Sequence, residues 1–159
     1  MSQPVTPEHF DAVLFDLDGV LTTTRTVHAA AWQRMFDDFL TSWDADHGTH
    51  TATFDERDDY ATYVDGKPRQ AGVRDFLQAR GITIPEGTPG SPPEENSVWG
   101  LGNRKQLLVE DELRRTGVEV FPGSVAWVRE LRKAGLKTAV VSSSRNCRSV
   151  LEYAGISNL

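Results

Sequence analysis

Two aspartates, Asp16 and Asp18, are the residues whose type and spacing best suit chemistry in this sequence. They follow a short apolar run, Ala12–Phe15, and precede Gly19, a residue that lets the backbone turn away. Two carboxylates facing one cleft suit phosphoryl transfer, in which one attacks phosphorus and the other moves the proton. The alternative interpretation is a loop that carries two solvated acids.

Phosphoryl transfer by these aspartates needs a cation, because a carboxylate and a phosphate repel each other. At ~4 Å and an effective dielectric constant of ~20, the repulsion is about 4 kcal/mol for each pair of charges. A divalent cation offsets this repulsion, and hard oxygen ligands favour Mg²⁺. The pair therefore predicts a magnesium-dependent reaction.

Ser142 holds the corresponding position after a second apolar run, Thr138–Val141. A hydroxyl there, together with backbone N–H groups of the following turn, can hold a phosphoryl oxygen. Alternatively, the serines at 142–144 cap the helix that follows. The residues alone do not decide between the two interpretations.

The elements that must position these residues are two strands and two helices. Each apolar run is short and bounded by polar residues, which is typical of a fully buried strand in a parallel sheet. A helix is predicted to begin at Pro122 and stop at Gly135, and another to run from about Asn146 to Ala154. This alternation of strands and helices predicts an α/β protein.

The first strand and Pro122 are separated by roughly a hundred residues, far more than a crossover needs. Apolar residues recur there at steps of three and four, which is a helical pattern. Further helices are predicted at 57–64, 72–79 and 101–115, with breaks at 44–53 and 81–96. The simplest organisation is a helical subdomain inserted into an α/β core. The clearest helical repeat comprises Trp32, Met35, Phe36, Phe39, Leu40 and Trp43.

A net charge of −6, from 17 Lys and Arg against 23 Asp and Glu, argues against a general binder of nucleic acid or anionic membranes. The apolar runs are too short for a transmembrane helix, and the N-terminus shows no signal-peptide pattern. The single cysteine, Cys147, cannot form an internal disulfide, which favours a reducing compartment. We therefore predict a cytoplasmic protein that binds neither nucleic acid nor membranes.

Two stretches resemble motifs of the haloacid dehalogenase superfamily. Residues 15–22, Phe-Asp-Leu-Asp-Gly-Val-Leu-Thr, resemble its first motif, and residues 140–146, Val-Val-Ser-Ser-Ser-Arg-Asn, resemble its second motif in the β-phosphoglucomutase-like form. The resemblance covers nearly the whole chain. It implies a Rossmann-like α/β core of parallel strands, made of residues 1–23 and 118–159, with an inserted helical cap at residues 24–117.

The resemblance also implies roles for single residues. Asp16 would be the nucleophile that becomes an aspartyl-phosphate, and Asp18 the general acid and base. The Asp16 carboxylate and the Asp18 backbone carbonyl would hold Mg²⁺. The implied phosphate-binding residues after the second strand are Ser142, Ser143, Arg145 and Asn146.

In the implied cap, Thr24 would lie at the hinge to the core. Arg69 matches an arginine that grips the second, non-transferring phosphate of the substrate. The other expected substrate-binding residues of the cap are His28, Trp32 and Lys105.

The activity implied by the resemblance is Mg²⁺-dependent conversion of β-glucose 1-phosphate to glucose 6-phosphate through an aspartyl-phosphate. A sugar-phosphate phosphatase is an alternative, because the sequence does not show whether water or a sugar hydroxyl accepts the phosphoryl group. An alternative of another class is a catalytically inactive fragment that only binds sugar phosphates.

The family's third-motif lysine and fourth-motif acids lie downstream of the second strand, and the sequence after Ser142 contains neither Lys nor Asp. We therefore expect these 159 residues to be part of a longer enzyme or fusion and to be inactive alone. The first strand is then expected to have an open apolar edge, through which the chain could self-associate.

Overall fold

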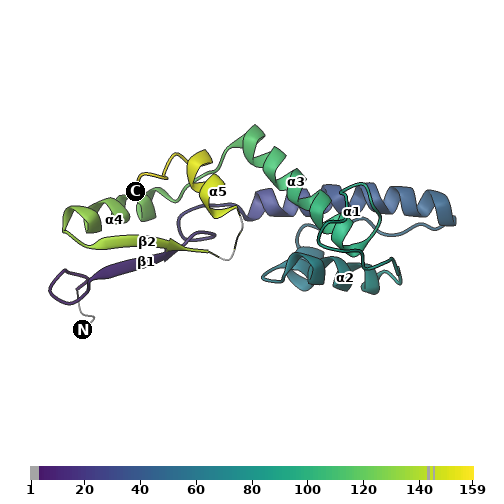
Figure 1. Cartoon of the computed structure of the whole chain (residues 1–159), viewed down its shortest axis with the longest axis horizontal. Helices are drawn as coiled ribbons and strands as arrows, with labels where there is room; N and C mark the ends of the chain where they lie inside the picture. The colour runs from purple at the N-terminus through teal and green to yellow at the C-terminus, as the bar shows by residue number, and fades with distance from the viewer. Residues whose placement is uncertain (1–3, 143, 145) are drawn as a thin grey trace. The chain divides into compact units, whose positions relative to one another are not determined.

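The chain forms two compact units in a computed structural model, which describes residues 4–142, 144 and 146–159. The terminal unit combines the residues up to Thr26 with Leu113–Leu159, and the central unit is Val27–Glu112. Figure 1 shows the order of the elements along the chain.

The terminal unit is built on two parallel strands, β1 (Ala12–Asp16) and β2 (Lys137–Val141) (Figure 1). The register pairs Ala12 with Lys137 and Asp16 with Val141. Because the strands run in the same direction and end together, the residues that follow them emerge at the same edge of the sheet. The predicted α/β class with parallel strands is confirmed.

Two helices accompany the strands, α4 (Pro122–Lys133) and α5 (Cys147–Tyr153). Proline occupies the first turn of α4, where its fixed φ suits a helix start. The chain leaves α4 through Gly135 at φ +93°, a left-handed conformation that favours glycine. Both helices agree with the prediction to within one or two residues at each end. The residues of α4 that are buried are Val125, Val128 and Leu131.

The prediction that both strands are fully buried is wrong. Phe15 is 4% exposed, but Leu14 and Val141 are 67% and 58% exposed. On the face of Phe15, the strands line a small apolar cavity together with Val128 of α4 and Leu151 of α5. Side chains alternate between the two faces of a strand, so covering one face with helices leaves Leu14 and Val141 in solvent. We call these two residues the bare sheet face.

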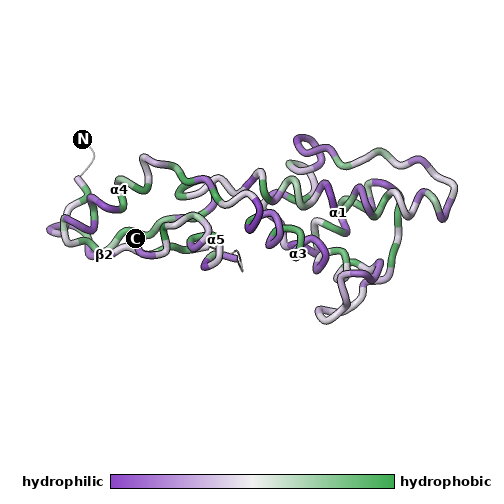
Figure 2. Tube along the Cα trace, turned by 90° about the horizontal axis from the view of Figure 1, so that it is seen from above, coloured by the Kyte–Doolittle hydropathy of each residue, from purple (hydrophilic) through white to green (hydrophobic). Residues whose placement is uncertain are grey.

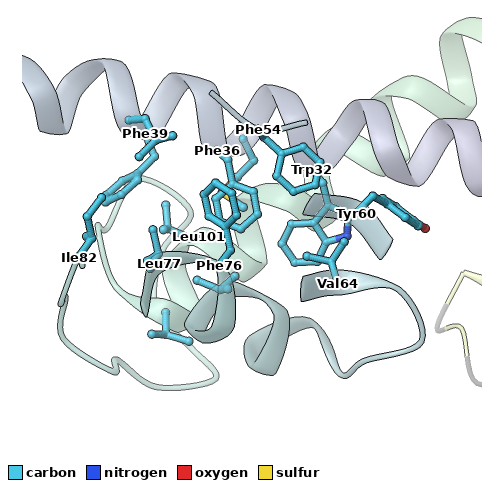
Figure 3. Packing of buried hydrophobic residues seen from close by; sticks show 14 of the residues in the cluster. Trp32, Phe36, Phe39, Phe54, Tyr60, Val64, Phe76, Leu77, Ile82 and Leu101 are labelled. Atoms are coloured by element: carbon cyan, nitrogen blue, oxygen red, sulfur yellow. The ribbon is translucent and has the colours of Figure 1, made fainter. Parts of the chain in front are cut away.

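The described central unit is built on three α-helices and a π-helix: α1 (Arg25–His47), α2 (Arg69–Ala79), α3 (Val98–Thr116) and η1 (Tyr60–Val64). The first two residues of α1 and the last four of α3 belong to the terminal unit. Apolar and polar residues alternate along α1 and α3 (Figure 2). Phe36 of α1 lies at the centre of an aromatic core, with ring centroids 3.9 Å from Phe76 and 5.3 Å from Trp32 (Figure 3). The helical repeat predicted from Trp32 onward is confirmed.

Two boundaries in the central unit differ from the prediction. Helix α1 continues to His47, into the stretch predicted as a break from Asp44. The Asp44 carboxylate accepts hydrogen bonds from the hydroxyls of Thr49 and Thr51, which ties the chain after Gly48 to the last turn of the helix. In the segment predicted as a helix at 57–64, residues 60–64 are π-helical.

Residues 80–97 connect α2 to α3 without a helix, as the run of Gly, Pro and Ser predicts. None of the helices in the described part of the chain combines the length and apolar character needed to cross a bilayer.

Candidate active site

The loop after β1 is organised by Leu17, which is fully buried. Its carbonyl oxygen accepts hydrogen bonds from the backbone N–H groups of Leu21 and Thr22, both at 3.0 Å, and from the Thr22 hydroxyl at 3.2 Å. Gly19 lies at φ +81°, and its N–H donates to the Thr22 carbonyl at 2.9 Å. The aspartate motif is therefore a closed turn around a buried leucine.

Asp16 and Asp18 lie on either side of Leu17 in sequence, and both are exposed. Because side chains alternate in extended backbone, burial of Leu17 directs both carboxylates toward solvent. Asp16 Oδ1 accepts the N–H of Leu17 at 2.7 Å. The hydroxyl of Thr24, a residue only 1% exposed, donates a hydrogen bond to Asp18 Oδ1. The predicted hinge residue thus holds the carboxylate of the predicted acid and base.

Backbone hydrogen bonds connect this turn to the segment before α4. The N–H of Thr23 donates to the Glu119 carbonyl, and the N–H of Phe121 donates to the Leu21 carbonyl, both at 3.0 Å. The turn is therefore anchored by main-chain hydrogen bonds to the segment before α4.

Ser142 follows β2 directly, so the register places it one residue beyond the partner of Asp16. Its Oγ accepts the N–H of Ser144 at 3.1 Å, and Ser144 Oγ accepts the N–H of Asn146 at 3.2 Å. The N-cap residue of α5 is Asn146. Ser142 therefore organises the turn after β2 and does not cap the helix. Two other predicted phosphate-binding residues, Ser143 and Arg145, lie outside the described residues.

Cys147, the first residue of α5, shows that the two turns approach each other. Burial raises the pKa of its thiol, and the Asp18 carboxylate raises it further. An anion near Cys147 disfavours the thiolate. The turn after β1 and the start of α5 therefore share one electrostatic environment.

In the central unit, Lys105 of α3 meets two predicted residues of α1. Lys105 is 5% exposed, and its Nζ lies 2.8 Å from His28 Nδ1 and 4.9 Å from the centroid of the Trp32 ring. Burial lowers the pKa of His28, and the Lys105 ammonium lowers it further, to about 3. The imidazole is therefore neutral near pH 7, with Nδ1 accepting a hydrogen bond from the ammonium.

Arg69, the first residue of α2, belongs to the same part of the central unit. Its Nη1 donates to Gln106 Oε1 at 2.8 Å, and Gln106 adjoins Lys105 on α3. A Cβ at Gly102 would lie 3.5 Å from the Arg69 side chain. The Arg69 side chain therefore lies against α3 at Gly102.

The structure therefore gathers the predicted residues into two groups. The first is in the terminal unit, at the ends of β1 and β2, and the second is in the central unit, along α1, α2 and α3. Sequence reasoning missed Gln106, which positions Arg69. The sequence marks Gln106 only as a polar residue in the predicted helix 101–115, four positions after Gly102.

Residues 10–158 match the family model of the haloacid dehalogenase-like hydrolases. The chain belongs to this family. The resemblance inferred from the two motifs is thereby confirmed.

Two of the named proteins with similar sequences come from mycobacteria. A β-phosphoglucomutase of Mycobacterium bovis is 48% identical over 150 residues, which cover 94% of this chain and 57% of that protein. An uncharacterized glycosyl hydrolase of Mycobacterium tuberculosis is 36% identical over 154 residues, which cover 95% of this chain and 11% of that protein. The chain thus spans little more than half of the first relative and a small part of the second.

A solved haloacid dehalogenase family hydrolase from Deinococcus radiodurans, with bound phosphate and sodium, has a similar fold. It superposes with a TM-score of 0.56 at 28% identity, over 92% of this chain and 53% of that one. The Rossmann-like α/β fold expected for the family is therefore confirmed.

The donor atoms of this haloacid dehalogenase-like chain fit a magnesium ion in part. The described residues contain no group of three or more His, Cys, Asp or Glu side chains placed to hold a metal. Asp16 and Asp18 nevertheless offer hard oxygen atoms on the exposed side of one turn. Mg²⁺ is commonly held by one or two carboxylates and completes its shell with water and substrate oxygens.

Proposed function

We propose that this chain takes part in Mg²⁺-dependent phosphoryl transfer on a sugar phosphate, in the manner of a β-phosphoglucomutase. The observation that carries the proposal is the register of β1 and β2, which brings Asp16 and Ser142 to the same edge of the sheet. Open α/β sheets bind ligands beyond the carboxyl ends of their strands. The 48% identity to a protein named β-phosphoglucomutase supports the substrate class.

In the proposed reaction, an Asp16 carboxylate oxygen attacks phosphorus, and the bond between phosphorus and the sugar oxygen breaks. Asp18 gives its proton to the departing sugar oxygen. In the second step a hydroxyl attacks the aspartyl-phosphate, Asp18 takes the proton of that hydroxyl, and Asp16 is released. Thr24 keeps the Asp18 carboxyl in place through its hydrogen bond.

The other groups of the terminal unit hold the transferring phosphoryl group in this proposal. Ser142 and Asn146 supply polar groups from the turn after β2, and Ser143 and Arg145 are proposed to join them. The Asp16 carboxylate and the Asp18 backbone carbonyl would hold Mg²⁺. Bound there, the cation supplies positive charge that offsets the repulsion between carboxylate and phosphate.

We assign residues 1–23 and 118–159 to the catalytic core and residues 24–117 to a cap. His28, Trp32 and Lys105 form one contact group in the central unit, and Arg69 is joined to it through Gln106. We propose that Arg69 binds the phosphate that is not transferred, since a guanidinium matches phosphate geometry.

Product analysis separates the proposed mutase from the alternatives. The protein is incubated with β-glucose 1-phosphate, a trace of glucose 1,6-bisphosphate and Mg²⁺, and glucose 6-phosphate and free phosphate are measured together. Formation of glucose 6-phosphate without release of an equal amount of free phosphate supports the mutase. Release of free phosphate without glucose 6-phosphate supports the phosphatase. Each activity must disappear in Asp16→Asn.

We further propose that residues 1–159 alone turn over slowly, because the sequence after Ser142 contains no lysine to match the third family motif. If turnover is absent, calorimetric titration with glucose 6-phosphate tests the binding-module alternative. Absence of both turnover and binding would contradict the proposed function.

Two further expectations belong to this proposal. The bare sheet face supports self-association through the edge of β1, because an exposed strand with apolar side chains can pair with a second copy. A cytoplasmic location is consistent with the single cysteine of the chain.

A further inference from the structure

The segment Pro85–Ser97, here called the 85–97 loop, satisfies the first amides of α3. The carbonyl of Pro85 accepts the N–H of Val98 at 3.0 Å, and the carbonyl of Glu86 accepts that of Trp99 at 3.1 Å. Ser97 Oγ accepts the N–H of Gly100 at 3.1 Å. The first N–H groups of a helix have no partner within it, so the loop takes over this role for α3.

Two side chains of α3 hold the same loop one turn further along. Asn103 Nδ2 donates to the Ser91 carbonyl at 2.9 Å. Arg104 Nε donates to the Pro93 carbonyl at 2.7 Å, and its Nη2 donates to Asn96 Oδ1 at 3.2 Å. The loop therefore contacts α3 through both its backbone and its side chains.

Close packing requires glycine at one position of α3 facing the loop and at one position within the loop itself. A Cβ at Gly100 would lie 2.1 Å from the Glu95 carbonyl oxygen. A Cβ at Gly87, which has φ +73°, would lie 2.4 Å from Ser97 Oγ. Gly90 differs, because a Cβ there has its nearest neighbour at 4.0 Å. The packing of the loop therefore needs glycine at position 87 but not at position 90.

The residue that follows these contacts is Lys105. Its ammonium is buried against His28 and Trp32, and burying a cation is costly unless it keeps hydrogen-bonding partners such as His28 Nδ1. The loop contacts residues 98, 99, 100, 103 and 104 of α3, all directly before Lys105. These contacts fix where α3 begins and how it is rotated.

We propose that the 85–97 loop is a positioning element that holds the Lys105 ammonium at His28. This inference rests on the proposed function, with His28 and Lys105 as the substrate-binding residues of the cap expected from the sequence. Asn103 and Arg104 act through Lys105 and do not themselves touch substrate.

The test is the titration of His28, followed by NMR of the labelled imidazole in the full chain. In the wild-type chain and in Gly90→Ala the pKa of His28 is expected near 3. In Gly87→Ala the loop must move, Lys105 leaves its position, and the pKa of His28 rises by at least about 1 unit. A merely structural loop would lower the melting temperature of Gly87→Ala without moving this titration.

A second pair of variants keeps the test decisive if Gly87→Ala does not fold. Arg104→Ala removes the hydrogen bonds of Arg104 to the Pro93 carbonyl and to Asn96 Oδ1, and it is expected to raise the pKa of His28. Arg104→Lys restores one donor and is expected to bring the pKa of His28 part of the way back to the wild-type value. A pKa that stays near 3 in every folded variant overturns the proposal.

Titration with glucose 6-phosphate separates this inference from the proposed function. If the variants raise the pKa of His28 and also weaken binding at least threefold, both stand. If the pKa rises and binding is unchanged, the positioning role stands, and the role of Lys105 in the proposed function fails.

Discussion

Nζ of Lys105 lies 2.8 Å from Nδ1 of His28, although 77 positions separate the two residues in sequence. The contact joins a buried ammonium to an imidazole that stays neutral, since burial and the ammonium both lower the pKa of His28. Nδ1 of the histidine is thus the hydrogen-bond acceptor for the lysine ammonium.

The free energy of unfolding should decrease as the pH is lowered through the range in which His28 is protonated in the unfolded chain but not in the folded one. Folding lowers the pKa of His28 from 6.5 to about 3, so the unfolded state binds more protons between these values and the free energy of unfolding decreases as pH falls. The full effect is on the order of 5 kcal/mol. Urea unfolding of wild type and His28→Asn between pH 7 and pH 4 checks it. Equal slopes for the two chains would contradict the assignment.

Lys105→Met should weaken ligand binding and also lower stability. The methionine avoids the cost of burying a charge, but it leaves Nδ1 of His28 without the ammonium donor, which costs about 1–3 kcal/mol. Loss of a hydrogen bond to a charged group costs ~1.5–3 kcal/mol in binding, roughly a 10- to 100-fold loss of affinity. Calorimetry with glucose 6-phosphate and thermal unfolding measure the two effects. The matched control is Lys133→Met, whose side chain is 72% exposed.

Thr24→Val should reduce phosphoryl transfer, because it removes the hydroxyl that donates to Asp18 and nearly preserves side-chain volume. General acid–base catalysis accelerates a reaction ~10²–10⁴-fold. We expect displacement of the Asp18 carboxylate to lower the turnover rate roughly tenfold or more. The measurement is Asp16-dependent turnover of a phosphate ester. Thr23→Val is the control, since the Thr23 hydroxyl faces the Glu119 carbonyl. Equal rates in both variants would remove Thr24 from the mechanism.

The thiol of Cys147 should react slowly with iodoacetamide at pH 7. Burial and the Asp18 carboxylate raise its pKa, so little thiolate is present. Asp18→Asn removes the nearby negative charge and should accelerate alkylation less than tenfold, because burial is the larger cause and is unchanged. The pH dependence of the alkylation rate, read by mass spectrometry, checks this. Asp46→Asn, in the central unit, should leave the rate unchanged.

Leu14→Lys should abolish self-association. Leu14 is 67% exposed on β1, and a lysine on an edge strand opposes pairing with another chain. Sedimentation velocity over a concentration series should show a dimer for the wild type and a monomer for Leu14→Lys. Leu107→Lys, at a position 52% exposed on α3, is the control and should still dimerise. A wild-type chain that stays monomeric throughout would refute the proposed edge pairing.

The sequence by itself determined the parts of this protein that depend on neighbours along the chain. The apolar runs predicted both strands, the proline and glycine signals predicted α4 and α5, and the motif around Asp16 indicated the family. These features follow from local backbone preferences and from side-chain alternation, which a sequence displays directly.

Only the tertiary structure decided which residues meet and which face remains bare. The Gly100-Leu101-Gly102 stretch illustrates the difference: the 85–97 loop packs so closely that it excludes a Cβ at Gly100, whereas a Cβ at Gly102 would make only an ordinary contact with Arg69. The pairing of His28 with Lys105 and the exposure of Leu14 likewise depend on packing between distant segments. Such contacts are chosen by shape, burial and charge in three dimensions, and residue type alone does not encode them.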